Sequence, residues 1–344
     1  MAEVGTSTAS LAEQPTSSAR ATDTSTTRRV TMGLLLRRLV TPRRRVTPAT
    51  ARRWVMLPRM PDHRLDPVTE PTALADLLAW RNAYRARLLA PTGWWAVSNL
   101  AWIDGSSAWL GGGDELRLPT RAPARLARLE PDGDDLALTP SAAGTLTLDG
   151  EPLDAPVRLT GGGAQLRVVA DPDLTVTVVQ RGERWGVRVY DSAQARARAS
   201  DPVAWFEPEP GWSVTASVEH AGDGATLSIV DVLGDAREVA VAARLRFALA
   251  GHEHTLLATD AGGRLFVNFR DATNGSETYG AGRFLTVDPP VNGRTVLDFQ
   301  RAHHPPCAHT PHAMCPLPPL ANRLTIAVRA GERWPPGTVN GRCA

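Results

Sequence analysis

Short segments in which apolar and polar residues alternate dominate the chain from Trp94 onward. Such alternation places apolar side chains on one face of an extended segment and polar ones on the other, which is typical of half-buried β-strands. Gly, Asp or Pro residues bound most of these segments, the clearest being DELRLP, DDLALT, GTLTLDG, AQLRVVA, LTVTVVQRG, WGVRVYD, WSVTASVEH, ATLSIVDVLG, RLFVNFRD and RLTIAVRAGE. Their density predicts a mainly β fold, an antiparallel sandwich or barrel.

One segment upstream of these strands has a helical period. Apolar residues of TALADLLAWRNAYRARLLAP recur three or four positions apart on one side, at Leu74, Leu77, Leu78, Tyr84 and Leu88. Arg residues occupy much of the remaining surface. Thr72 is suited to cap the start of a helix, and Pro91 to end it. The pattern predicts one amphipathic helix of about 17 residues.

The N-terminal part of the chain differs in composition. Residues 1–64 carry 12 Arg against four acidic residues, and no Lys occurs anywhere in the chain. Residues 1–27 are rich in Ser, Thr and Ala, so they bury too little apolar surface to offset the entropy of folding. We therefore expect a disordered, Arg-rich tail over residues 1–70. A targeting segment, a functional arm, or a true start at Met56 or Met60 are alternatives for the same stretch.

The rest of the chain is expected to form one β-rich domain over residues 71–337, followed by a short tail over residues 338–344. A weak break falls near residues 191–211, where small and charged residues and then prolines interrupt the strand pattern. The strands on its two sides belong either to two lobes or to one continuous sheet system.

The composition also restricts the protein class. No apolar run approaches the ~20 residues that span a bilayer, and the apolar core of residues 33–36 is too short for a secretory signal. We expect a soluble, cytoplasmic protein whose cysteines are thiols. No Gly-rich phosphate loop or βαβ alternation is present. The pattern indicates no particular cofactor or oligomeric state, and it favours a small-molecule ligand over nucleic acid as a partner.

Residues 270–284, RDATNGSETYGAGRF, are the first candidate site. They follow the strand RLFVNF directly, and glycines bracket their polar side chains. Polar groups held at a strand end by such a loop are typical of a ligand pocket. The candidate groups are Asp271, Glu277, Thr278, Tyr279 and Arg283. The alternative is a long hairpin whose polar side chains face water or cap the turn.

Residues 303–319, HHPPCAHTPHAMCPLPP, are the second candidate. Cys307, His309, His312 and Cys315 are soft or borderline ligands within nine residues, which suggests a zinc site. However, tetrahedral sites usually draw paired ligands from two separated turns, and six prolines stiffen this loop. The prolines favour a structural clasp.

The two cysteines have several possible roles. Cys307 and Cys315 are candidates for buried thiols, a disulfide or redox pair, half of a metal site, or a catalytic nucleophile. His303 and His304 precede a proline, which restricts the backbone there to extended geometry and turns the two side chains to opposite faces. At most one of them can therefore face a given pocket, where it could transfer protons.

These two stretches resemble a known family. DATNGSETYGAGRFL, LDFQRAHHPPCAHTPHAMCPLPPLANRL and AGER, together with the upstream WRNAYRARLLAPTGWWAVSNLAWIDG, RGERWGVRVYD and VAWFEP, are similar to the bacterial and archaeal domain-of-unknown-function family DUF1684 over about residues 72–334. The shared signature includes Asp271, Glu277, Thr278, Tyr279, Arg283, Asp298, Cys307 and Cys315. Histidines 303, 304, 309 and 312 depart from it, so the resemblance does not imply a zinc site. It also implies no established activity.

Three functional hypotheses follow. The first is a pocket between the 271–283 loop and the 298–315 segment that binds or transforms a small, anionic metabolite. Arg283 would hold the anion, with Thr278, Asp298, Cys307 and Cys315 also binding; the acid–base candidates are Asp271, Glu277, Tyr279 and His304. The second is a non-catalytic β module in which Arg283 pairs with Glu277 or Asp298 and joins two sheets. The third, based on architecture alone, is a flavin-binding barrel.

Overall fold

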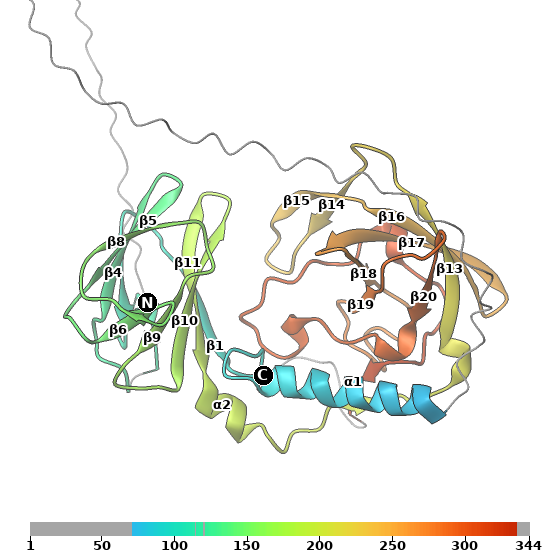
Figure 1. The fold of residues 1–344 in the computed structure, drawn as a ribbon, viewed down its shortest axis with the longest axis horizontal. Coiled ribbons are helices and arrows are strands. Elements are labelled where there is room, and N and C mark those ends of the chain that lie inside the picture. Colours follow the sequence, from blue (N-terminus) through green and yellow to red (C-terminus); the bar gives the residue numbers. More distant parts are fainter. Residues whose placement is uncertain (1–70, 114, 120, 336–344) are drawn as a thin grey trace, which may run out of the picture. The chain divides into compact units, whose positions relative to one another are not determined.

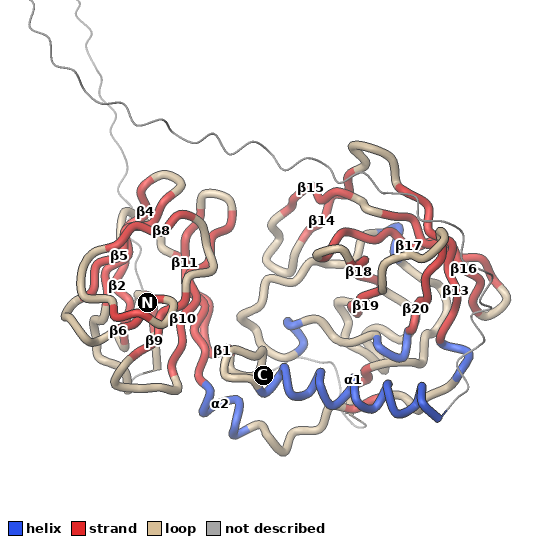
Figure 2. Tube along the Cα trace, viewed as in Figure 1, coloured by secondary structure: helices blue, strands red, loops and turns tan. Residues whose placement is uncertain are grey.

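The computed structural model describes residues 71–113, 115–119 and 121–335. The predicted tails over residues 1–70 and 338–344, and Cys343, lie outside these described residues. The described residues belong to one compact unit. They are mainly β, as the alternating pattern predicts, and long loops connect the strands (Figure 2).

The expected helix is α1, Pro71–Leu89. It begins one residue before the predicted cap Thr72, since proline suits the first turn of a helix, and it ends ahead of Pro91. Leu77, Tyr84 and Leu88 are buried as expected. Leu74 and Leu78 are instead exposed, at 48% and 47%. The buried stripe is therefore narrower than the apolar stripe of the sequence.

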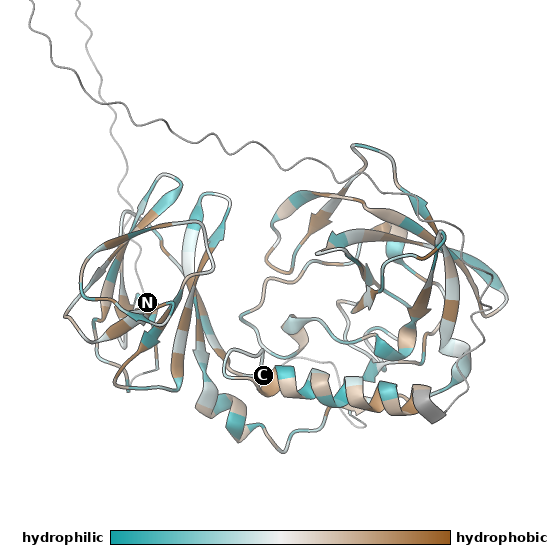
Figure 3. Cartoon of the chain, viewed as in Figure 1, coloured by the Kyte–Doolittle hydropathy of each residue, from teal (hydrophilic) through white to brown (hydrophobic). Residues whose placement is uncertain are grey.

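Residues 97–191 form two sheets around one hydrophobic core. The first sheet has the order β1-β11-β10-β9-β6-β7 and the second β3-β2-β4-β5-β8, and all neighbours are antiparallel except β2 and β3. Apolar and polar residues alternate along many of the strands (Figure 3). The bounds are β1 Val97–Trp102, β2 Ala108–Gly111, β3 Leu116–Arg117, β4 Ala127–Asp132, β5 Asp135–Pro140, β6 Leu146–Leu148, β7 Glu151–Pro152, β8 Val157–Thr160, β9 Gln165–Val168, β10 Leu174–Arg181 and β11 Arg184–Asp191.

The segment with the weak sequence break contains short elements. Asp191 caps a second helix, α2, Ser192–Ala197, by accepting a hydrogen bond from the Ala193 N–H. Strand β12, Ala204–Trp205, and a 3₁₀ turn, η1, Pro210–Trp212, follow. The small residues of this segment gave no periodic signal for α2. A domain boundary here stays a prediction.

Residues 213–298 form a second six-stranded antiparallel sheet, β19-β18-β17-β16-β13-β20, which curves into a half-barrel around its own core (Figure 1). A separate hairpin pairs β14 with β15. The bounds are β13 Ser213–His220, β14 Thr226–Val230, β15 Ala236–Ala240, β16 Ala243–Leu249, β17 His252–Ala261, β18 Arg264–Phe269, β19 Arg283–Val287 and β20 Arg294–Asp298, followed by the 3₁₀ turns η2 Phe299–Arg301, η3 Pro306–Ala308 and η4 Leu320–Asn322, and by β21 Glu332–Arg333, which pairs with β12.

The prediction of a β-strand over RLTIAVRAGE is wrong. Residues 324–331 are irregular, and within the described part of the chain only β21 follows them. Leu324 donates to the Arg270 carbonyl and Ile326 accepts from the Ala272 N–H, which is the start of a ladder with the residues after β18. The ladder stops because the partners of residues 328–330 are side chains rather than a strand, as described below.

No helix among the described residues has the length and apolar character needed to cross a membrane.

Candidate functional site

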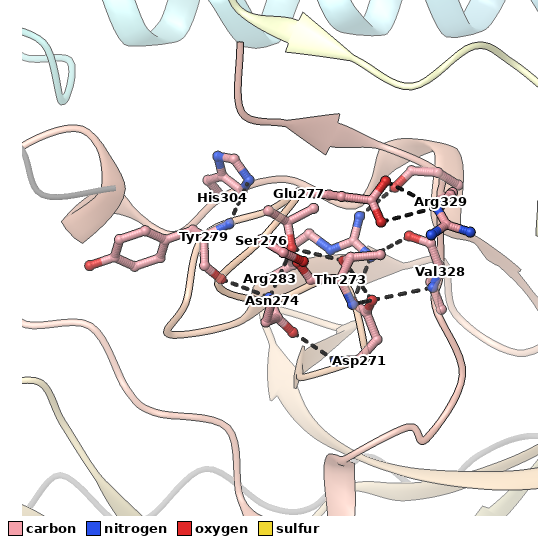
Figure 4. A network of polar contacts seen from close by, with 12 residues as sticks. Asp271, Thr273, Asn274, Ser276, Glu277, Tyr279, Arg283, His304, Val328 and Arg329 are labelled. Carbon is pink, nitrogen blue, oxygen red and sulfur yellow. Dashed lines mark hydrogen bonds and ion pairs between the residues drawn. The ribbon is translucent and has the colours of Figure 1, made fainter. Parts of the chain in front are cut away.

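A buried ion pair anchors the loop between β18 and β19. Arg283 opens β19, Asp271 follows β18, and the Arg283 Nη2 lies 2.7 Å from the Asp271 Oδ2 with both side chains 0% exposed. Arg283 also donates to the Val328 carbonyl at 2.7 Å and to the Ala330 carbonyl. Figure 4 shows this network. Its bonds are internal, so Arg283 already has partners for its two terminal nitrogens.

The other Asp271 oxygen completes the network. Oδ1 accepts from the Thr273 N–H at 2.9 Å, the Thr273 hydroxyl at 2.6 Å and the Val328 N–H at 3.2 Å. Thr278 is buried too, with its hydroxyl 2.9 Å from that of Thr273. Asp271, Thr278 and Arg283 therefore hold the loop in one conformation and tie it to residues 328–330.

Glu277 and Asp298 lie outside this network. The Glu277 carboxylate accepts from the Arg329 Nε at 3.0 Å, in an exposed pair. Asp298 caps η2 by accepting from the Gln300 N–H, and pairs with Arg301 at 3.1 Å. The expectation that Arg283 pairs with Glu277 or Asp298 is thus wrong, because Asp271 is the carboxylate that is buried beside the guanidinium.

The two candidate stretches meet at Tyr279 and His304. The Tyr279 N–H donates to the His304 Nε2 at 3.2 Å, and Phe284 pairs with His303 through two backbone hydrogen bonds of 2.9 and 3.0 Å. The ring centroids of His304 and Trp334 are 4.8 Å apart, and those of Tyr279 and Trp334 are 5.8 Å apart. Figure 4 shows the Tyr279 ring directed away from the Arg283 network.

Glu332, in β21, orients His304 from the other side. Its Oε1 lies 3.4 Å from the His304 Nδ1, and its Oε2 accepts from the His304 N–H at 2.7 Å and the Tyr84 hydroxyl at 3.0 Å. Burial raises the pKa of Glu332, but its electrostatic interaction and hydrogen bonds with His304, together with the nearby His309, outweigh this effect and lower the pKa to about 2. Glu332 is therefore an ionised group inside the protein.

His309 belongs to the same buried cluster. Its Nδ1 accepts from the Trp95 indole at 3.3 Å, which leaves the proton on Nε2, 3.1 Å from the Tyr84 hydroxyl. Burial lowers its pKa to about 4, so the ring is neutral near pH 7. His309 thus joins α1 to the second candidate stretch.

Cys307 and Cys315 lie side by side as free thiols. The Cys307 N–H, in η3, donates to the Cys315 Sγ at 3.1 Å. Cys315 is buried, whereas Cys307 is only partly buried. The hydrogen bond from Cys315 lowers the pKa of the Cys307 thiol; burial opposes this shift, and the Tyr279 hydroxyl adds to it. The hydrogen bond between the two thiols is the largest cause that raises the pKa of Cys315, and burial is the second. Cys307, the less buried residue, therefore carries the thiol that ionises more readily.

The four residues of the zinc hypothesis are divided between two environments. The cysteines contact each other and Tyr279, while His309 bonds to Trp95 and Tyr84. Among the described residues, no group of three or more His, Cys, Asp or Glu side chains could hold a metal ion.

The comparisons with known proteins identify one part of the chain. A family model described as "Protein of unknown function (DUF1684)" matches residues 199–333. Residues 199–333 belong to the DUF1684 family. The match includes every candidate site residue discussed here, whereas the expected likeness over residues 72–198 lies outside it. No curated protein matches the chain.

A solved structure is also similar to this DUF1684 protein. It is the solution NMR structure of an uncharacterised protein of Haloarcula marismortui, 33% identical in sequence, with a TM-score of 0.35. The match covers 41% of this chain and 81% of that chain.

Sequence reasoning missed four residues that surround His304 and His309: Glu332, within the DUF1684 region, and Trp334, Trp95 and Tyr84, outside it. Glu332 lies in AGER, which was noted only as a family match. A single buried carboxylate has no pattern around it, and its partners lie up to 248 positions away. Because Arg329 and Arg333 flank Glu332, the charge pattern of the sequence gives no signal for a buried carboxylate at this position.

A cleft of about 370 Å³ lies elsewhere, beside α1. It is lined by Leu78, Arg81, Asn82, Arg85, Ser200, Asp201, Pro202, Val203 and Trp205. Arg81 stacks over the Trp205 ring at 4.8 Å and donates to the Phe206 carbonyl, and Arg85 donates to the Ala199 and Asp201 carbonyls. The arginines of this open cleft are largely occupied by protein partners, and none of the candidate site residues lines it.

Proposed function

We propose that the DUF1684 domain binds a small molecule where the 276–282 loop meets the 303–315 segment, that Tyr279 and Cys307 are the groups that contact it, and that the buried His304 positions Tyr279 from behind. The observation that carries the proposal is the convergence of an oriented imidazole, a phenol and a partly exposed thiol from two distant stretches. Groups of these kinds gathered on rigid backbone are what a reactive binding site requires.

The proposal gives the remaining candidates supporting roles. Asp271, Thr278 and Arg283 fix the loop that carries Tyr279, since their polar groups bond within the protein. The Glu332 carboxylate orients His304 by contacting both the imidazole ring and the backbone N–H of His304. Such second contacts hold a reactive group within a narrow range of positions. The ligand need not be an anion, because the guanidinium that was expected to hold one is paired internally.

A thermal-shift screen tests binding. The full-length chain is heated with single members of a panel of organic acids, amino acids, nucleotides and flavin mononucleotide. A ligand at about 100 times its Kd stabilises the folded state by about 2.7 kcal/mol, which raises the melting temperature measurably. We expect hits whose shift falls in Tyr279→Phe and Cys307→Ser. Tyr190→Phe, the same change in β11 and outside the DUF1684 region, should keep it.

Two results would count against the proposal. One is a panel that leaves the melting temperature of the unchanged chain where it was. The other is a hit whose shift is equal in all three variants. A shift and a yellow colour with flavin mononucleotide would favour the flavin hypothesis, which otherwise rests on the half-barrel alone.

The second candidate is a non-catalytic β module. The fully buried pair of Asp271 and Arg283 favours it, because a charged pair without solvent contact acts on the fold and not on a ligand. It predicts that variants of the buried pair change stability and that no variant of the loop changes the response to a ligand. The same screen separates the two candidates.

A further inference from the structure

We propose that Cys307 and Cys315 form a dithiol that exchanges with low-molecular-weight disulfides, with Cys307 as the attacking sulfur and Cys315 as the resolving one. This inference rests on the proposed function, because it assigns a substrate class to the same site.

The geometry of the reduced pair carries the inference. The Cys315 Sγ lies 3.1 Å from the Cys307 nitrogen, and with an N–Cα bond of ~1.46 Å it lies within about 4.6 Å of the Cys307 Cα. In a disulfide, whose S–S bond is about 2.05 Å long, each sulfur lies within about 5 Å of the Cα atom of the partner cysteine. The second sulfur is therefore already at the distance from which side-chain rotation can close a bond, and the seven residues between the cysteines form a loop that can accommodate it.

The backbone around both cysteines is fixed. The Val232 N–H donates to the Cys315 carbonyl at 3.0 Å, and the Asn268 amide donates to the Pro316 carbonyl at 2.8 Å. Cys307 lies in η3, which begins with Pro306 and ends in a turn closed by backbone hydrogen bonds. Because the pair is held in place before any reaction, little backbone entropy is lost when the bond forms.

The environments of the two sulfurs differ as an attacking and a resolving thiol require. Cys307 is partly exposed, so a small disulfide can reach it, whereas Cys315 is only 4% exposed. The hydrogen bonds from Cys315 and Tyr279 lower the pKa of Cys307 against the effect of burial. The hydrogen bond to Cys307, burial and the Cys307 charge raise the pKa of Cys315. Once Cys307 has reacted, its sulfur carries no charge. The Cys307 charge then no longer raises the pKa of Cys315.

The exchange balances in two steps. The Cys307 thiolate attacks one sulfur of R–S–S–R; the reagent S–S bond breaks, a Cys307–S–S–R bond forms, and R–S⁻ leaves and takes up a proton. The Cys315 thiol then loses its proton and attacks the Cys307 sulfur, forming the internal disulfide and releasing the second R–S⁻, which is protonated in turn. Two protein thiols are oxidised by two electrons, and the small disulfide is reduced to two small thiols.

The test uses bis(2-hydroxyethyl) disulfide with the full-length chain, and Cys343→Ser in parallel to remove the third thiol. Released 2-mercaptoethanol is counted, and the products are mapped by peptide mass spectrometry after acid quench. In the Cys343→Ser background we expect two thiols per chain and a Cys307–Cys315 disulfide. Cys315→Ser should stop at one thiol and keep the mixed disulfide on residue 307. Cys307→Ser should lose reaction at both positions, and dithiothreitol should restore the unchanged chain.

The inference is overturned if the unchanged chain stops at the mixed disulfide, if Cys315 is the sulfur that first carries the adduct, or if neither cysteine reacts. Failure of exchange with a retained, Tyr279-dependent ligand shift in the thermal screen overturns this inference alone. Absence of both exchange and ligand shift overturns the proposed function as well. Exchange without any shift supports the dithiol and limits the ligand to the disulfide itself.

Discussion

Asp271→Asn isolates the contribution of the buried ion pair. The amide keeps an oxygen for Thr273 and Val328, which bond to Oδ1, but it places an NH₂ group where Oδ2 lies 2.7 Å from the Arg283 Nη2. Two donors then face each other, and the Arg283 charge is left at 0% exposure without its counter-ion. The size and shape of the side chain are unchanged, so electrostatics is the main variable.

The expected cost is large. Removing one partner of a buried ion pair typically destabilises a fold by 3–5 kcal/mol, because the other charge stays desolvated. For a domain of this size, that corresponds to a fall in melting temperature of roughly 6 to 20 °C. A matched control is Glu277→Gln. It breaks the exposed pair with Arg329, which joins the same two segments, and exposed pairs contribute little. Its melting temperature should stay close to that of the unchanged chain.

Urea unfolding followed by tryptophan fluorescence measures both variants. Trp334, one of the ten tryptophans of the chain, lies in this region, where its backbone N–H donates to the Glu277 carbonyl at 2.9 Å. If Asp271→Asn lost less than about 1 kcal/mol, the pair would not be desolvated as described, and the support it gives to the Tyr279 loop would have to come from elsewhere. Equal losses in Asp271→Asn and Glu277→Gln would refute the reasoning in the same way.

Two further predictions concern pH and the loop backbone. Burial holds the pKa of His309 at about 4, below the ordinary value of about 6.5, so the unfolded chain binds more protons between these values. Stability should therefore fall as the pH drops from about 6.5 to 4. In His309→Gln the melting temperature should depend less on pH over this range. A variant with the same dependence of melting temperature on pH as the unchanged chain would contradict this. Gly282 has φ +104°, and an added Cβ would meet Pro318, so Gly282→Ala should destabilise the fold by more than about 2 kcal/mol in urea. Gly275 has φ +89° and open space around it, so Gly275→Ala should lower the free energy of unfolding much less. If both variants lost the same free energy of unfolding, backbone strain alone, and not the contact with Pro318, would explain the loss at Gly282.

The strands were predictable because a half-buried strand carries its own signal. Strand β16, with alternate residues buried from Ala243 to Leu249, illustrates this local pattern. The segment after Leu324 shows its limit. Its alternation is equally regular, but the Arg283 guanidinium bonds to its carbonyls in place of a neighbouring strand. Periodicity indicates which residues are buried and not which group satisfies the backbone.

The site was predictable in part. Tyr279, His304 and Cys307 stand in two stretches rich in unusual residues, and those stretches do meet. What the sequence could not provide was the pairing among them. Arg283 has several acidic residues within reach along the chain, and burial alone decides that Asp271 is its partner. The four ligand-like residues of the zinc hypothesis are neighbours in sequence but turn to different surroundings in the folded chain.

The bond between Tyr84 and Glu332 has a consequence for biosynthesis. Its two residues are 248 positions apart, and a ribosome adding about 5–20 residues per second needs roughly 12 to 50 seconds to make the intervening chain. During that interval Tyr84 is present in α1, but the Glu332 carboxylate that accepts its hydrogen bond is not. The Tyr84 hydroxyl therefore lacks its carboxylate partner until β21, the last described strand, has been made, whereas Trp95, Tyr190 and the other apolar partners of α1 are available earlier.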